Sequence, residues 1–207
     1  MVTITMVYDQ LRPEERMLLQ SAEKLGVDLT PLSASELTVE VSSREKPSEI
    51  GDAVLQRCVS YFRNLHLTAA LEAKGIPVVN SFNSTLTCGN KLFVTLALMK
   101  AGVPTPKTYV AFTTKGGLKA LEQLGYPAML KPVVGSWGRM VAPLKDADSA
   151  KALFEDREYM YPIYQVLYIQ EMVKRPPRDI RCFVVGDEAI AAIYRLSLIH
   201  ISEPTRP

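Results

Sequence analysis

Apolar runs alternate with amphipathic stretches along the first 80 residues of the chain. The apolar run at residues 2–8 predicts a β-strand. A helix is expected over residues 12–25, because a proline and two glutamates fill its first turn and a glycine follows its end. A weak extended stretch at residues 37–42 precedes a long helical pattern at residues 52–75, and residues 76–80 read as a short buried strand. This alternation predicts an open sheet with helices packed on it, an α/β fold.

The rest of the chain continues the alternation of strands and helices. Helices are predicted over residues 92–102, 117–125 and 146–156, and strands over residues 103–112, 126–134 and 164–173. Residues 183–195 contain two apolar runs around the dipeptide Gly186-Asp187, which is typical of a β-hairpin turn. We therefore expect a second sheet that ends in a hairpin.

Composition narrows the class of protein. The 207 residues are 47% hydrophobic and 22% charged, as in an ordinary globular protein, and the net charge of +2 gives no basis for binding nucleic acid. No apolar run approaches the roughly 20 residues of a membrane helix, and the first residues lack a signal-peptide pattern. Three cysteines without paired spacing fit a reducing compartment. We therefore expect a cytoplasmic protein with no nucleic-acid or membrane partner.

The first candidate site lies around Lys131. This lysine ends an apolar strand, where a buried ammonium group needs an anionic partner. The following segment GSWGR, residues 135–139, has glycines that let a loop close over an anion, a hydroxyl at Ser136 and a planar fork of donors at Arg139. A simple hairpin turn with an exposed Trp137 is the alternative, but the preceding lysine favours a phosphate site. The Walker pattern is absent, since the lysine precedes the glycines.

Two further features fit a nucleotide. Gln170-Glu171 ends a predicted strand, where backbone groups and a carboxylate can meet an adenine amine and a ribose. Lys91 lies at a predicted helix start, where backbone dipoles favour phosphate. Taken singly, the glutamate reads as a solvated side chain and the lysine as a surface residue.

Taken in order, these segments resemble a known family. The chain carries TCGNK, LKPVVGSWGR, YIQEMV and RDIRCFVVGDEAIAAIYR, as in the RimK-like branch of the ATP-grasp ligases. Within that branch it is similar to the ligases that join α-aminoadipate to a small acidic amino-group carrier protein in lysine biosynthesis. The resemblance spans residues 1–195 and includes the opening YDQLRPEER. It implies an N-terminal open α/β domain at residues 1–81 and an ATP-grasp region at residues 82–195.

The resemblance also implies the roles of individual residues. The expected ATP-binding residues are Lys91 and Lys131 at the phosphates, Gly135, Ser136, Trp137, Gly138 and Arg139 in a loop over them, Gln170, Glu171, Met172 and Val173 in the adenine hinge, and Asp179 near the ribose. Glu171 and Val173 would act through their backbones. Arg181 and Arg195 are the expected catalytic residues, in the pocket for substrate and phosphate.

The implied reaction is amide formation driven by ATP. Phosphoryl transfer to a carboxylate would give an acyl-phosphate that an amine attacks, with Mg²⁺ neutralising the phosphate oxygens. The expected partners are ATP, α-aminoadipate or glutamate, and the carrier protein with its C-terminal glutamate, and the complete protein is expected to be a homo-oligomer. Two alternatives stay open: a RimK-type glutamate ligase acting on a protein tail or a pterin cofactor, and a nucleotide-binding module without catalysis.

The last residues do not fit this pattern. Residues 196–207, beginning LSLIHISEPTR, resemble the translation of a transposase-type sequencing adapter, and we expect them to be a non-native tail. The C-terminal part of the ATP-binding lobe, which in this family carries the magnesium ligands, would then be missing. We therefore assign no metal ligand in this chain and expect the 207-residue product to be inactive.

Overall fold

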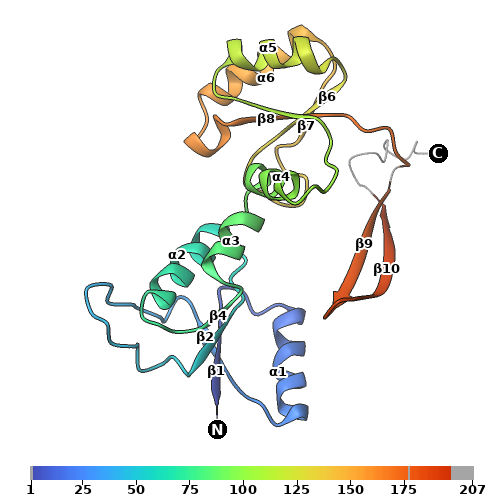
Figure 1. Cartoon of the computed structure of the whole chain (residues 1–207). Coiled ribbons are helices and arrows are strands. Elements are labelled where there is room, and N and C mark those ends of the chain that lie inside the picture. The colour runs from blue at the N-terminus through green and yellow to red at the C-terminus, as the bar shows by residue number, and fades with distance from the viewer. Residues whose placement is uncertain (1, 177, 197–207) are drawn as a thin grey trace, which may run out of the picture. The chain divides into compact units, whose positions relative to one another are not determined.

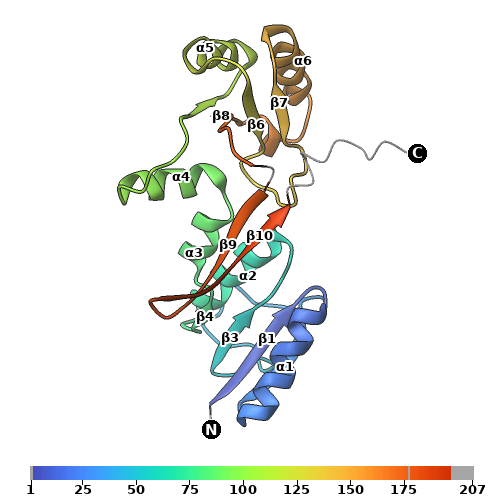
Figure 2. The ribbon, with the colours of Figure 1, turned by 90° about the vertical axis from the view of Figure 1, so that its right-hand side faces the viewer.

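The computed structural model describes residues 2–176 and 178–196. The chain forms two compact units, one within residues 1–102 and the other within residues 103–207. Figures 1 and 2 show the elements of each from two directions.

Unit 1 is built on a parallel sheet. Its four strands lie in the order β2-β1-β3-β4, with bounds Thr3–Tyr8 (β1), Asp28–Ser33 (β2), Ala53–Gln56 (β3) and Val78–Val79 (β4). The helices are α1 (Pro13–Leu25), α2 (Tyr61–Glu72), α3 (Phe82–Cys88) and α4 (Lys91–Lys100). Helix α1 connects β1 to β2 at one edge of the sheet, and α2 connects β3 to β4 at the other edge. Because such crossovers are right-handed, α1 and α2 lie on opposite sides of the sheet (Figure 1). Val7, Val54 and Leu71 are buried between the sheet and α2.

Unit 2 contains an antiparallel sheet with helices on one side. Its strands lie in the order β5-β8-β6-β7, with bounds Thr108–Ala111 (β5), Ala128–Lys131 (β6), Ala142–Leu144 (β7) and Leu167–Glu171 (β8). Helices α5 (Thr114–Leu124) and α6 (Ala147–Glu158) are followed by the short 3-10 turn η1 (Pro162–Tyr164). Leu121 of α5 and Phe154 of α6 are buried against Leu130 and Ile169 of the sheet.

The two helices of unit 2 approach each other closely at Gly117. A Cβ atom at this position would lie 2.6 Å from the Phe154 ring, so only glycine allows this contact. Because side chains alternate along a strand, the neighbours of Leu130 on β6 and of Ile169 on β8 point to the other face of the sheet. Helices α5 and α6 cover the face that carries the buried apolar residues. The opposite face of the sheet is therefore covered by neither helix.

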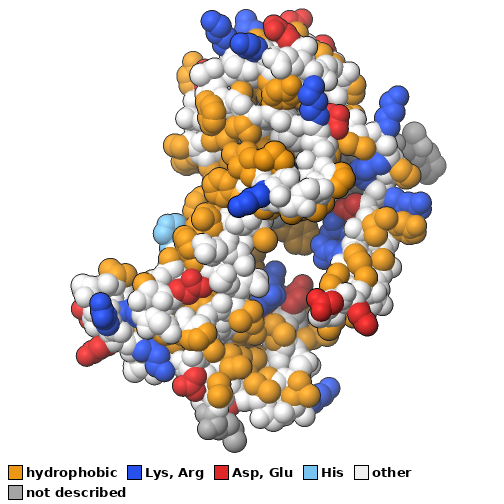
Figure 3. All heavy atoms as spheres, in the orientation of Figure 1, with side chains coloured by type: hydrophobic (Ala, Val, Ile, Leu, Met, Phe, Trp, Pro, Cys, Tyr) orange, Lys and Arg blue, Asp and Glu red, His pale blue; other side chains and the backbone are white. Residues whose placement is uncertain are grey.

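The predicted hairpin is confirmed. Strands β9 (Arg178–Val185) and β10 (Glu188–Leu196) form an antiparallel pair, and Gly186 takes the left-handed backbone of the turn, with φ +60°. Many of its apolar side chains are exposed (Figure 3). Val184 and Ile190 are each 62% exposed. Two isolated strands bury little apolar surface, so the hairpin adds little to the core of unit 2.

Two predicted elements of unit 1 are wrong in type. Residues 37–42, expected to be extended, form no strand, and the edge strand is instead β2 at residues 28–33. The helix expected over residues 52–75 starts as strand β3, because its first residues pair with β1. The helical part begins only at the cap Ser60, whose hydroxyl accepts a hydrogen bond from the Arg63 backbone.

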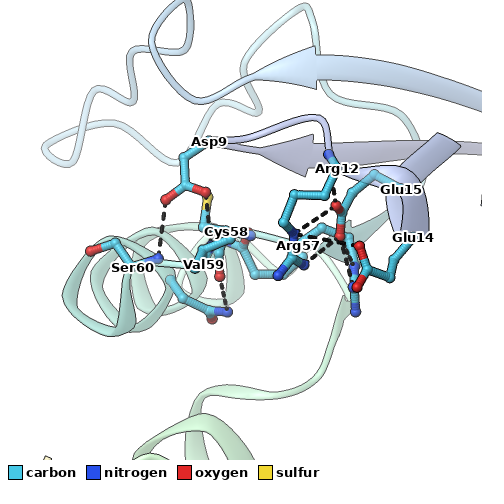
Figure 4. A network of polar contacts seen from close by, with 10 residues as sticks. Asp9, Arg12, Glu14, Glu15, Arg57, Cys58, Val59 and Ser60 are labelled. Carbon is cyan, nitrogen blue, oxygen red and sulfur yellow. Dashed lines mark hydrogen bonds and ion pairs between the residues drawn. The ribbon is translucent and has the colours of Figure 1, made fainter. Parts of the chain in front are cut away.

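A buried carboxylate ties two loops of unit 1 together (Figure 4). Glu15, in the first turn of α1, is fully buried, and its Oε1 lies 2.7 Å from Nη2 of both Arg12 and Arg57. Asp9 adds a second tie, accepting hydrogen bonds from the backbone N–H groups of residues 59 and 60 at 2.8 and 3.1 Å. The hydrogen bond from Arg12, with the contribution of Arg57, lowers the pKa of Glu15 to about 2. These contacts fix the carboxyl ends of β1 and β3 relative to each other.

Replacing Glu15 should destabilise unit 1 in a pH-dependent way. Glu15→Gln removes charge-assisted hydrogen bonds from a buried site, so we expect the free energy of unfolding at pH 7 to fall by about 2 kcal/mol. Because the folded pKa lies below the unfolded value of about 4.3, the stabilisation is present above that pH and lost as the pH falls toward 2. Urea unfolding followed by circular dichroism at several pH values measures both effects.

The neighbouring Glu14 provides the control for this experiment. Its side chain is 63% exposed, so Glu14→Gln should leave the free energy of unfolding nearly unchanged. Equal losses in the two variants, or an acid-induced decline that is the same in Glu15→Gln and the wild type, would contradict this role of Glu15.

Candidate functional site

A polar cluster lies on the face of the unit 2 sheet opposite α5 and α6. Lys131, at the end of β6, donates from Nζ to Oε1 of Gln170 at 2.6 Å. The amide nitrogen of Gln170 donates in turn to the hydroxyls of Thr108 at 2.9 Å and Tyr168 at 3.1 Å. The cluster thus draws on β5, β8 and β6, which pair side by side. The pairing holds the Lys131 ammonium group in a defined place on this face.

The glycine-containing loop after Lys131 has an unusual backbone. Four of its residues take a positive φ: Gly135 at 141°, Trp137 at 63°, Gly138 at 69° and Met140 at 61°. Trp137 and Met140 carry side chains that disfavour this conformation, at a cost of roughly 1–3 kcal/mol each. The Trp137 ring is 86% exposed, and two backbone hydrogen bonds inside the loop are long, at 3.3 Å each. Such a strained, open loop is typical of a ligand-binding segment.

The predicted hinge continues from the polar cluster. The N–H of Glu171 donates to the carbonyl of Lys107 at 2.9 Å, and its carboxylate accepts from the Lys107 N–H at 2.9 Å. The Glu171 side chain is therefore used to hold the chain that leads into β5. Beyond Glu171 the chain leaves β8, and Val173 is half-exposed.

The hairpin brings the three remaining predicted residues of unit 2 to one face. Asp179 lies opposite Arg195 and accepts two hydrogen bonds from it, from Nε at 3.0 Å and from Nη2 at 2.5 Å. The bond from Arg195 lowers the pKa of Asp179. Arg181 lies two residues further along β9, opposite Ile193, and so shares the face of this ion pair. Both arginines and the aspartate are solvent-accessible there.

Lys91 belongs to unit 1, where the segment TCGNK has a clear structural basis. Asn90 caps α4, since its side-chain oxygen accepts from the N–H of Leu92 at 2.9 Å. A Cβ at Gly89 would lie 2.0 Å from the Tyr61 ring, so this close contact requires glycine. Lys91 is then the first residue of α4, and burial lowers its pKa.

Sequence reasoning missed Thr108 and Tyr168. Both alternate with core residues on their strands, and that alternation is the only signal that places them on the face of Lys131. Within residues 2–176 and 178–196, no group of three or more His, Cys, Asp or Glu side chains is arranged to hold a metal ion. The described helices include none that is long and apolar enough to cross a membrane.

Comparisons with known proteins assign both parts of the chain. Residues 4–87 match the LysX preATP-grasp domain, and residues 88–198 match the RimK-like ATP-grasp domain. The α-aminoadipate–LysW ligase LysX of Saccharolobus solfataricus is 37% identical over 187 residues, which cover 90% of this chain and 68% of that protein. The glutamate–LysW ligase ArgX of Sulfolobus acidocaldarius is 32% identical over 193 residues, 93% of this chain and 67% of that protein. The predicted domain boundary after residue 81 stays a prediction.

The fold has counterparts among solved structures. The RimK-domain ATP-grasp protein of Sphaerobacter thermophilus superimposes with a TM-score of 0.74 at 25% identity, covering 89% of this chain and 69% of that one. The expected family resemblance and fold class are confirmed by these matches. The chain belongs to the RimK-like ATP-grasp family of ligases, with a LysX-type preATP-grasp domain before the ATP-grasp domain.

Proposed function

We propose that the protein is an ATP-dependent carboxylate–amine ligase that joins α-aminoadipate, or glutamate, to the C-terminal glutamate of a LysW-like carrier protein. The observation that carries this proposal is the 37% identity to a LysX ligase over 90% of the chain. The ligase would transfer a phosphoryl group from ATP to the carboxylate of the carrier's C-terminal glutamate, releasing ADP. The amino group of the amino acid would then attack the acyl-phosphate, forming the amide and releasing phosphate. The work of the protein in such a reaction is to position the reactants and stabilise charge.

Several residues of unit 2 are suited to bind ATP. Lys131 offers a part-buried ammonium group on the sheet face opposite α5 and α6, and the loop at residues 135–139 can turn N–H groups and Arg139 toward phosphate oxygens. We propose that the backbone at residues 171–173 receives adenine. That Lys91, at the start of α4 in unit 1, also binds phosphate stays a prediction from the sequence.

The hairpin residues suit the binding of reacting anions. A guanidinium has five N–H donors, and Asp179 accepts from only two of those on Arg195. Arg195 is thus held in orientation while its other donors can face a phosphate or carboxylate. Arg181 on the same face would provide a second positive charge, and Asp179 would lie near the ribose.

Magnesium is the expected companion of ATP in this family. The residues described by the structure do not form a cluster of acidic ligands, so we assign none of them to the metal. That its ligands lie outside these residues stays a prediction. We also propose cytoplasmic action, since Cys88 and Cys182 are exposed free thiols, which suits a reducing compartment, and we propose that the complete protein is a homo-oligomer.

A second candidate is a ligase that adds glutamate to a pterin cofactor. The tetrahydromethanopterin:α-L-glutamate ligase of Methanosarcina acetivorans is 38% identical over 136 residues, but these cover only 60% of this chain. A second such ligase, of Methanococcus maripaludis, matches 84% of the chain at 28% identity, so coverage alone does not separate the two candidates. The match of residues 4–87 to the LysX preATP-grasp domain favours the carrier protein as acceptor.

A ligation assay tests the proposed function. We expect a version of this protein spanning the full length of its LysX relatives, given MgATP and a carrier protein ending in glutamate, to release ADP and to increase the carrier mass by one α-aminoadipate residue. Glutamate and a pterin acceptor are tested in parallel. If ATP is consumed with none of these acceptors modified, the ligase proposal fails.

Arg139→Ala should weaken ATP binding without unfolding the protein. Arg139 is exposed on the loop, so its removal should leave the thermal midpoint unchanged, while the loss of a charge-assisted contact to phosphate weakens ATP affinity about tenfold. Trp137, the single tryptophan of the chain, reports binding through its fluorescence. Lys145→Ala removes an exposed positive charge just after β7 and is the control. A lower thermal midpoint with unchanged ATP affinity would show that the loop is purely structural.

A further inference from the structure

Arg157, in the last turn of α6, is a buried cation. The residue is only 4% exposed, and burial lowers the pKa of its guanidinium group. Among the described residues, the ion pairs do not include Arg157. A guanidinium placed in such surroundings must be compensated by hydrogen bonds, because its desolvation is unfavourable. Its contacts therefore show what this side chain holds in place.

The shortest contact of Arg157 goes to the end of the glycine loop. Nη2 donates to the carbonyl oxygen of Met140 at 2.6 Å. The other contacts are weaker: Nη1 lies 3.8 Å from Sδ of Met160, and the guanidinium carbon lies 5.5 Å from the centre of the Tyr164 ring. Met140 is one of the two residues of the loop that take a positive φ without being glycine. Arg157 thus stabilises the loop at a strained position.

This hold matters because the loop is weakly fixed by its own contacts. The two backbone hydrogen bonds inside it measure 3.3 Å each, and Trp137 and Arg139 extend into solvent. Two residues beyond Met140 the chain enters β7, which belongs to the rigid sheet. The Arg157 contact therefore sets where the loop rejoins the sheet, and with it the direction of Arg139, the residue just before Met140.

We propose that Arg157 is a positioning residue for the phosphate loop: it binds the Met140 carbonyl and thereby holds Arg139 and the backbone N–H groups of residues 135–139 in the geometry that receives the phosphates. The part of this proposal that concerns ATP rests on the proposed function. The part that concerns the loop does not, and it is measurable without nucleotide.

Arg157→Met tests this role, because methionine fills much of the same space but cannot donate to the Met140 carbonyl. In the folded variant we expect trypsin to cleave the Arg139–Met140 bond about tenfold faster, the factor expected from losing one charge-assisted hydrogen bond. The fluorescence anisotropy of Trp137 should fall, and ATP affinity measured from Trp137 fluorescence should weaken about tenfold. Arg157→Lys retains the positive charge and a donating ammonium group, and should give intermediate values.

Lys151→Met is the matched control, since it removes an exposed cation from the same helix. It should leave cleavage, anisotropy and ATP affinity as in the wild type. If Arg157→Met does not unfold cooperatively, Arg157→Lys decides the question alone. Wild-type cleavage and anisotropy in a folded Arg157 variant would overturn the proposal. If the wild type itself does not bind ATP, the proposed function fails while the two loop measurements still decide the role of Arg157.

Discussion

The hydrogen bond between Lys131 and Gln170 is the contact on which the proposed nucleotide site depends. It holds an ammonium group on the side of the unit 2 sheet that α5 and α6 leave uncovered. The apolar residues Leu130 and Ile169, adjacent to this pair on their strands, are buried on the opposite face. The same two strands thus build the core with one set of side chains and present a cation with the other. The strained loop leaves the sheet immediately after this lysine.

Four positive charges, at Arg12, Arg57, Lys131 and Arg195, fall into two physical groups. Arg12 and Arg57 share the buried carboxylate of Glu15, and their role is to join two loops of unit 1. Arg195 is oriented by Asp179, yet the pair lies on an accessible face of the hairpin. Lys131 is part-buried, and its contacts include the neutral amide of Gln170. The difference between a buried carboxylate and an accessible polar partner separates structural cations from those suited to bind an anionic ligand.

Much of this arrangement could be predicted from the sequence, and the exceptions have physical causes. Residues 53–56, Ala-Val-Leu-Gln, read as helix because three of these four are good helix formers, but pairing with β1 makes them a strand. The glycines at 135 and 138 indicated a loop that can close over an anion, whereas local sequence did not indicate the positive φ of Met140 or the hydrogen bond from Arg157 to its carbonyl. Arg157 itself reads as an ordinary arginine near a helix end.

The polar cluster could not be assembled from local sequence either. Thr108, Lys131 and Gln170 lie far apart in the chain and meet only because β5, β8 and β6 pair in one register. A shift of one residue would turn Gln170 toward the core. Motif order alone gave the family and the candidate residues, while their side-chain contacts required the structure.

The affinity for ATP of Lys131→Met, measured by titration calorimetry, tests the nucleotide site most directly. If the Lys131 ammonium binds phosphate, the dissociation constant should rise about tenfold or more, while circular dichroism shows an intact fold. Lys119→Met, which removes an exposed lysine from α5 on the other side of the sheet, should bind ATP as the wild type does. Wild-type ATP affinity in a folded Lys131→Met variant would contradict the assignment of this sheet face as the nucleotide site.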